Sequence, residues 1–172
     1  MKQHITYISG HVGSGKTILG EMLQEKFASC ARVESDFLIL VKPFEIGPKL
    51  TELSVKNTIS VVSNFLEEGY ENILIVGGVW NQEQLDQYLR KFPTEKYDVS
   101  VFWLHASKDV RNARALKRGD PGDNMEWLEK VEASLPYPML PLKVLGSAFH
   151  QIEAEHKKPE EVLDEVWRKV NN

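Results

Sequence analysis

Short apolar runs alternate with segments of helical periodicity along the whole chain. Two of the runs, NILIVGG and VSVFWLHA, are almost continuously apolar, as expected for strands that are covered on both faces. Because strands that alternate with helices are typical of βαβ units, we expect one parallel sheet. The five predicted strands are His4–Ser9, Ala31–Ser35, Asn72–Gly77, Val99–His105 and Phe149–Glu155.

Local signals mark the ends of the helices between these strands. Gly69 is placed to end one helix, Ser107 to begin the helix after the fourth strand, and Pro159 to lie in the first turn of the last helix. The segment Pro136–Ser147 contains three of the eight prolines and is predicted to be irregular. The turn-rich sequence RGDPGD at Arg118–Asp123 separates two helical patterns, so we expect a mobile loop there.

The composition is that of an ordinary globular domain. With 42% hydrophobic and 27% charged residues, the 172-residue chain can form one compact domain over 1–172. A formal charge of −4 argues against a general nucleic-acid binder, whose phosphate contacts require a basic surface. The single cysteine excludes an internal disulfide, and no apolar run reaches the roughly 18–20 residues that span a bilayer. The N-terminal stretch lacks the pattern of a secretory signal. We therefore expect a cytoplasmic protein, monomer or homodimer, that binds neither membrane nor nucleic acid.

The strongest chemical signal follows the first predicted strand. The sequence Gly10-His11-Val12-Gly13-Ser14-Gly15-Lys16-Thr17 fits the P-loop (Walker A) pattern G-x-x-x-x-G-K-[ST] at every defined position and opens a helical segment. Glycines at 10, 13 and 15 let the amides around Ser14 point into one concavity, where a helix N-terminus favours phosphate. Lys16 is expected to reach the β- and γ-phosphates of ATP, and Thr17 to offer its hydroxyl to Mg²⁺. A plain glycine-rich turn would leave this pattern unexplained.

A carboxylate is predicted at the carboxyl end of the second strand. In a parallel sheet, Asp36 would lie at the edge where ligands collect, beside the P-loop. It could orient or deprotonate an acceptor hydroxyl, or hold a magnesium-bound water. The alternative is that Asp36 caps the following turn. Glu34 is expected to face solvent.

Three arginines recur at helical spacing after the fourth strand. Arg111, Arg114 and Arg118 lie at i, i+3 and i+7, so a helix would carry them as one stripe. Arg114 and Arg118 come just before the predicted loop, where a guanidinium could stabilise the charge of phosphoryl transfer. A solvated basic face is the alternative, and for Arg111 it is the preferred interpretation.

The order of these motifs resembles the small P-loop kinases, which include shikimate kinase, gluconate kinase, adenylate kinase and chloramphenicol phosphotransferase. The resemblance rests on GHVGSGKT, the ESD sequence, the Gly77-Gly78 pair and R-x-x-x-R before a short loop. It implies a three-layer α/β/α fold with strand order 2-3-1-4-5 and a short lid around residues 118–124. It also implies that Asp36 binds or activates the acceptor, that Gly77 and Gly78 offer amides to it, and that Arg114 and Arg118 act as lid arginines.

Two departures from that family limit what the resemblance implies for this chain. The third strand ends in VGGVW without a magnesium-orienting carboxylate, a role that Asp36 could also take. Adenylate kinase-like enzymes grip a nucleotide with arginines, yet the segment Leu38–Thr51 has none, which favours a neutral or weakly charged small molecule. Apolar walls could come from Phe37, Phe44 and Ile46, which could equally be plain core residues. Two lysines, at 42 and 49, are available for an acidic group.

The sequence thus favours an ATP-dependent kinase that phosphorylates a hydroxyl of a small molecule. The alternatives are a nucleotide-binding regulatory protein and a simple hydrolase; a guanine switch would need N-K-x-D, which is absent. Lys157-Lys158-Pro159 lies where the family packs adenine, although a solvated turn explains it as well. His11 is taken to fill a variable loop position, and no histidine is assigned a catalytic role.

Overall fold

The computed structural model describes residues 2–120, 124–135, 140–144 and 149–171. Within these residues, the chain forms β1 (His4–Ser9), α1 (Lys16–Gln24), β2 (Cys30–Glu34), the 3₁₀ helix η1 (Ser35–Ile39), α2 (Pro48–Glu67), β3 (Asn72–Val76), α3 (Gln82–Lys91), β4 (Asp98–His105), α4 (Lys108–Arg118), α5 (Met125–Ser134), β5 (Phe149–Glu153) and α6 (Pro159–Val170). All five predicted strands are present, with ends that differ from the prediction by at most two residues. None of the described helices is long and apolar enough to cross a membrane.

The five strands form one parallel sheet in the order β2-β3-β1-β4-β5, as the resemblance implied. The central strands are buried almost throughout because helices cover both of their faces. The register pairs Ile8 of β1 with Val76 of β3, and Val76 with Glu34 of β2. The carboxyl ends of these three strands therefore lie level with one another, which brings the segments that follow them to one edge of the sheet.

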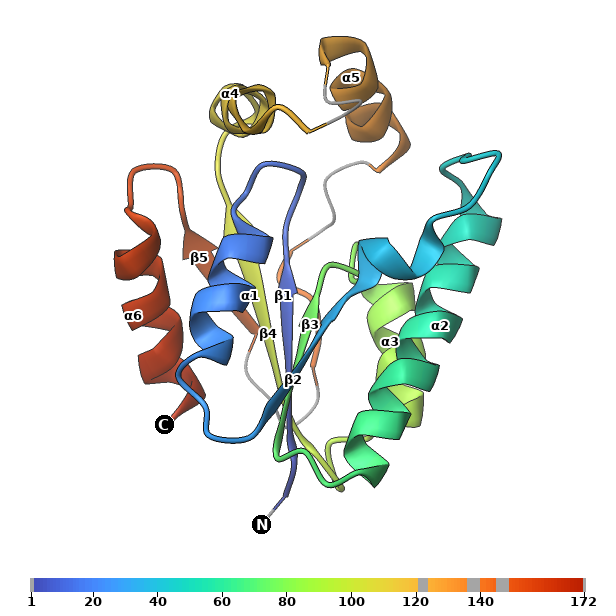
Figure 1. Cartoon of the computed structure of the whole chain (residues 1–172), viewed down its shortest axis with the longest axis vertical. Helices are drawn as coiled ribbons and strands as arrows, with labels where there is room; N and C mark the ends of the chain where they lie inside the picture. The colour runs from blue at the N-terminus through green and yellow to red at the C-terminus, as the bar shows by residue number, and fades with distance from the viewer. Residues whose placement is uncertain (1, 121–123, 136–139, 145–148, 172) are drawn as a thin grey trace.

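Helices form a layer on each side of the sheet (Figure 1). One layer consists of α1 and α6, and their apolar residues form one cluster with the side chains of Ile8, Leu74 and Phe102. The other consists of α2 and α3, whose cluster includes Ile5 and Ile75. The fold is therefore the predicted three-layer α/β/α sandwich, with a hydrophobic core on each face of the sheet.

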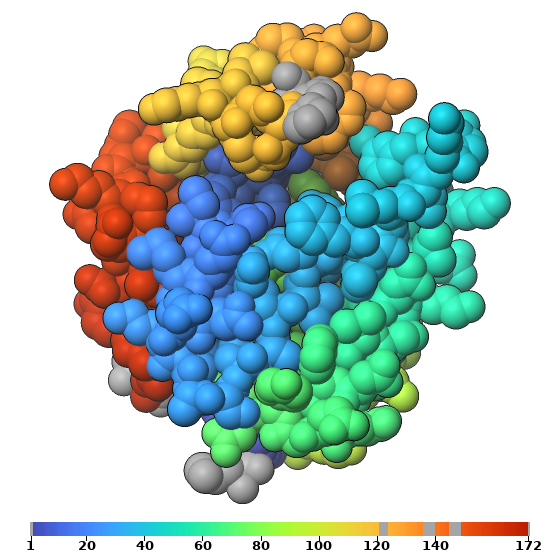
Figure 2. Space-filling model, viewed as in Figure 1, coloured from blue at the N-terminus to red at the C-terminus, as the bar shows by residue number. Residues whose placement is uncertain are grey.

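A short additional layer, α4 and α5, lies beyond the carboxyl ends of the strands (Figure 1). In the space-filling view, this yellow-to-orange segment lies across the top of the molecule, above the blue segment that contains α1 (Figure 2). The predicted break between two helices is confirmed, since α4 ends at Arg118 and α5 begins at Met125. Of the predicted lid loop 118–124, residues 121–123 lie outside the described part of the chain.

The predicted helix signals are largely confirmed. Pro159 is the first residue of α6, and Gly69 has a φ of 87° just after the end of α2. Ser107 occupies the N-cap position of α4, but its side chain makes no capping hydrogen bond; its backbone N–H instead donates to Glu155 Oε2 at 2.7 Å. Of the segment predicted to be irregular, residues 140–144 have no helix or strand, and the rest lies outside the described residues.

Candidate active site

The P-loop connects β1 to α1 in a conformation that requires glycine. Gly10, Gly13 and Gly15 have φ angles of 139°, 78° and 100°, in the region that side chains disfavour. At Gly13 the packing is also too close for a side chain, because an added Cβ would lie 2.1 Å from the carbonyl oxygen of Arg111. The loop therefore folds tightly against the backbone of α4, and its conformation depends on that contact.

The loop has the features that a phosphate group needs. The hydroxyl of Ser14 is buried and has no hydrogen-bond partner in the described part of the chain. Lys16, in the first turn of α1, is partly buried, and its Nζ donates to the carbonyl of His11 at 3.1 Å. Burial lowers the pKa of Lys16, and the carboxylates of Asp36 and Glu34 oppose that shift. An unpaired donor, a cation and a helix N-terminus thus meet in one place, a combination that fits bound phosphate.

A small cavity of about 160 Å³ lies on one side of the P-loop. Its wall includes Ser14 and Gly15 of the loop, Arg114 of α4, and Lys157 and Pro159 before α6. The Arg114 guanidinium donates to the carbonyls of Ala154 and Glu155, at 2.8 and 3.0 Å, and so holds the β5–α6 turn in place. Apolar side chains complete the wall: Ile18, Leu19, Leu104, Ala154 and Val162. A small, mostly apolar cavity beside a phosphate site suits a nucleobase.

A larger cavity of about 410 Å³ lies on the other side of the P-loop. Lys16, Asp36, Gly78 and Arg118 all line it, so four of the predicted site residues share one cavity. Its remaining described lining comes from Val12, Phe37, Ile39, Leu40, Phe44, Ile46, Gly47, Leu50, Thr51, Ser54, Trp80, Gln84, Asp120, Trp127, Val131 and Leu135.

The sheet places Asp36 in this cavity. Asp36 follows β2 by two residues and lies within the first turn of η1, and a Cβ built on Gly77 would be 3.7 Å from its Oδ1. The residue at the N-cap of η1 is Glu34, so Asp36 does not cap this turn. The two glycines after β3 differ in role: the Gly77 N–H donates to the carbonyl of Ile8 at 2.9 Å and is already paired, whereas Gly78 lines the cavity. The expectation that Gly77 offers its amide to an acceptor is therefore wrong.

Glu34 was missed as a site residue, because it was expected to face solvent. Its side chain is only 14% exposed and forms an ion pair with Arg32. The Thr17 hydroxyl donates to Glu34 Oε2 at 3.4 Å. Burial raises the pKa of Glu34, and Arg32 opposes that shift. A carboxylate next to the P-loop hydroxyl is placed to orient a water on Mg²⁺, the role for which the end of β3 provides no acid.

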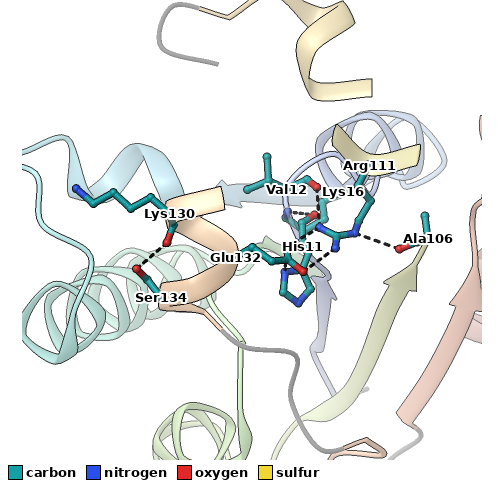
Figure 3. A network of polar contacts seen from close by, with 8 residues as sticks. All are labelled: His11, Val12, Lys16, Ala106, Arg111, Lys130, Glu132 and Ser134. Carbon is teal, nitrogen blue, oxygen red and sulfur yellow. Dashed lines mark hydrogen bonds and ion pairs between the residues drawn. The ribbon is translucent and has the colours of Figure 1, made fainter. Parts of the chain in front are cut away.

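Arg111 is not a solvated residue, and that prediction is wrong. Only 4% of it is exposed, because the backbone of α4 at this point lies against the P-loop. Its guanidinium donates to both carboxylate oxygens of Glu132 on α5, at 3.1 and 3.0 Å, and to the carbonyls of Ala106 and Val12, at 3.1 and 3.5 Å (Figure 3). The arginine therefore joins α5, the start of α4 and the P-loop.

His11 is a buried member of the same network. Its Nδ1 lies 3.4 Å from Glu132 Oε2, its side chain is 1% exposed, and its ring packs edge-on against Trp80 and Trp103. Burial lowers the pKa of His11 to about 4; Glu132 opposes the shift, and Arg111 and Lys16 add to it. Burial alone would raise the pKa of Glu132, but the hydrogen bonds from Arg111 and the nearby positive charges hold it below its usual value. The P-loop position that looked variable is thus a fixed neutral imidazole.

Comparison with known proteins identifies the fold. No protein-family model matches the sequence, and no curated protein matches it significantly. A sugar kinase from Janibacter sp. HTCC2649 superimposes with a TM-score of 0.73 at 12% identity, over 98% of this chain and 95% of that chain. APS kinase from Mycobacterium tuberculosis, in complex with AMPPNP and APS, gives 0.66 at 13% identity over 99% of both chains. Kti12 from Chaetomium thermophilum, in complex with ADP-AlF3, gives 0.60 at 12% identity over 96% of this chain and 98% of that chain. The chain therefore has the fold of the small P-loop kinases, as its motifs implied.

Proposed function

We propose that this protein is an ATP-dependent kinase that transfers the γ-phosphoryl group to a hydroxyl of a small molecule. The observation that carries the proposal is the pair of cavities on the two sides of the P-loop, with Lys16 and Asp36 lining the larger one. A nucleotide that filled the small cavity with its base would direct its phosphates along the loop towards Lys16. An acceptor in the larger cavity would then approach the γ-phosphate from the side of Asp36.

The residues divide the chemistry between them. The acceptor oxygen would attack the γ-phosphorus while the bond to the β,γ-bridging oxygen breaks, which releases ADP. The hydroxyl proton would pass to the Asp36 carboxylate and then to solvent. Lys16 would stabilise the phosphate charge throughout, and Arg118 would do so as the charge spreads over the equatorial oxygens. Mg²⁺ would neutralise the β- and γ-phosphates, held by the Thr17 hydroxyl and, through water, by Glu34.

The similar fold of proteins described as a sugar kinase and an APS kinase supports this proposal, as does the AMPPNP bound in the APS kinase structure. The fold is also shared with Kti12 in complex with ADP-AlF3. The second candidate is a nucleotide-binding protein or simple hydrolase without an acceptor. The two candidates make different predictions. A kinase consumes ATP in proportion to phosphorylated product, whereas a regulatory protein or simple hydrolase binds or hydrolyses ATP without forming one.

The test is incubation of the protein with ATP, Mg²⁺ and a panel of sugars, sugar acids, nucleosides and aromatic alcohols. ADP release and phosphorylated product, the latter by mass spectrometry, are measured together. We expect product from at least one acceptor, and no product with Lys16→Ala, which should weaken ATP binding about 10- to 100-fold through the loss of charged hydrogen bonds. ATP hydrolysis at the same rate with every compound, and no product, would favour the second candidate.

A further inference from the structure

Apolar side chains predominate in the described lining of the larger cavity, beside the neutral polar Thr51, Ser54 and Gln84. Four aromatic side chains line it: Phe37, Phe44, Trp80 and Trp127. Seven aliphatic side chains add to them: Val12, Ile39, Leu40, Ile46, Leu50, Val131 and Leu135. A volume of about 410 Å³ lies within the roughly 300–1,000 Å³ that is common for pockets that bind drug-sized ligands. The cavity therefore has room for the body of an acceptor as well as for the hydroxyl that Asp36 would contact.

Both cations in the described lining of this cavity already have a partner or a place in the phosphate site. Among the described lining residues, the charged ones are Lys16, Asp36, Arg118 and Asp120, and Arg118 pairs with Asp120 at 2.5 Å. Lys16 belongs to the phosphate site. The residues outside the described ranges include no lysine or arginine. Lys42 and Lys49 are exposed and do not line the cavity. A carboxylate or phosphate on the acceptor would therefore be buried without a cation, which is costly.

The apolar wall is exposed where a ligand would cover it. Phe37, Leu40 and Phe44 are 70%, 81% and 48% exposed, although they lie together between β2 and α2. Apolar side chains gathered in this way at the mouth of a cavity are typical of a binding surface. An acceptor with an apolar body would remove them from water, whereas the hydroxyls of a polyhydroxylated compound would find no hydrogen-bond partner among these three side chains.

The opposite wall is held in place before any ligand binds. Trp127, Val131 and Leu135 follow one another at helical spacing and form one face of α5 and its end. The same helix is tied through Glu132 to Arg111 and to His11 of the P-loop (Figure 3). Trp80 is fixed in turn by its edge-on contact with His11, at 5.1 Å between ring centroids. The aromatic surface is thus built onto the phosphate site.

We propose that the acceptor is an uncharged hydroxyl compound with an aromatic body, bound with its hydroxyl at Asp36 and its ring between α5 and the segment that carries Phe37 and Phe44. This inference rests on the proposed kinase function for the reaction, but the binding preference follows from the cavity alone. It can therefore be measured without turnover.

A matched pair of probes tests the preference. 1-Phenyl-1,2-ethanediol and mandelate share the phenyl ring and the benzylic hydroxyl and differ in a hydroxymethyl group against a carboxylate. Titration calorimetry in the presence of Mg²⁺ and a non-hydrolysable ATP analogue should show the diol binding at least about tenfold more tightly than mandelate, and 2-naphthylethanol more tightly than either. Glucose and gluconate should bind more weakly than the diol. Equal or tighter binding of mandelate or gluconate, or no binding of either aromatic alcohol, would overturn the proposal.

Variants locate the binding and separate it from the reaction. Phe44→Ala should weaken 2-naphthylethanol binding about tenfold, whereas Leu116→Ala, which removes a similarly exposed side chain that lies outside the cavity, should not change it. Equal effects would contradict the assigned site. If the diol binds but receives no phosphoryl group, the kinase function fails while the acceptor class stands; if gluconate is phosphorylated, the kinase function stands and the acceptor class is wrong.

Discussion

Glu132→Gln should destabilise the protein far more than an ordinary surface substitution on the same helix. The buried Arg111 guanidinium, 4% exposed, faces both Glu132 oxygens at 3.0–3.1 Å. Glutamine keeps one acceptor oxygen but presents an NH₂ group to the second donor, so one charged hydrogen bond is lost and the other becomes neutral. Charged hydrogen bonds contribute about 1.5–3 kcal/mol, and removal of one partner from a fully buried pair costs about 3–5 kcal/mol. Since Glu132 is itself 27% exposed, we expect a loss of about 1.5–3 kcal/mol.

The assay is urea unfolding at neutral pH with thermal unfolding beside it. For a chain of this size, about 1 kcal/mol lowers the melting temperature by about 2–4 °C, so Glu132→Gln should lower it by roughly 3–12 °C. The matched control is Glu129→Gln, on the exposed side of α5, which should stay within about 0.5 kcal/mol of the wild type. In an Arg111→Met background the effect of Glu132→Gln should shrink by at least about 1 kcal/mol, because no guanidinium is left uncompensated. Equal losses for the two glutamine variants would refute the reasoning.

The same variant has a defined pH dependence. The folded-state pKa of Glu132 lies below its unfolded value, so its stabilisation is fully present above the unfolded glutamate pKa and is lost as the pH falls through the folded one. The difference in unfolding free energy between wild type and Glu132→Gln should therefore be constant from about pH 6 to pH 8 and should shrink below about pH 4. A difference that persists unchanged in acid would mean that the carboxylate charge is not its source.

Four further variants test the two cavities and the P-loop histidine. Asp36→Asn should leave ATP binding intact and reduce phosphoryl transfer by about two to four orders of magnitude, as measured by product formation and calorimetry; loss of magnesium-dependent ATP binding would assign Asp36 to the metal instead. Arg118→Ala should lower kcat at least about tenfold with little change in ATP affinity, whereas Arg114→Ala, beside the small cavity, should mainly weaken ATP binding; identical profiles would contradict their separate cavities. Because the pKa of His11 is about 4 when folded and near its ordinary value when unfolded, wild-type stability should fall from about pH 6.5 to pH 5 by about 1–2 kcal/mol, and His11→Asn should reduce that slope; an unchanged slope would show that His11 is not its cause.

The sequence was informative where one local pattern decides the structure. The strands could be predicted because continuous apolar runs suit positions covered on both faces, and the P-loop because its glycines occupy backbone angles that other residues disfavour. Glu34 and Arg111 were misjudged for the opposite reason. Both side chains also contact partners supplied by distant segments, Thr17 for one and Glu132 for the other, and no local pattern encodes that proximity.

The arginine stripe shows how a correct pattern can conceal different roles. Arg111, Arg114 and Arg118 do lie on one helix at the predicted spacing. Helix α4 packs against the P-loop at Gly13, near Arg111, and each arginine contacts a different neighbour. Seven residues of α-helix span about 10 Å, which is enough to carry the stripe from a buried ion pair to the mouth of the larger cavity. Arg111 is held by Glu132, Arg114 by the turn before α6, and Arg118 by Asp120. Helix α4 therefore contacts the P-loop, the small cavity and the larger cavity. A shift of α4 against Gly13 would change the position of an arginine at each of these three places.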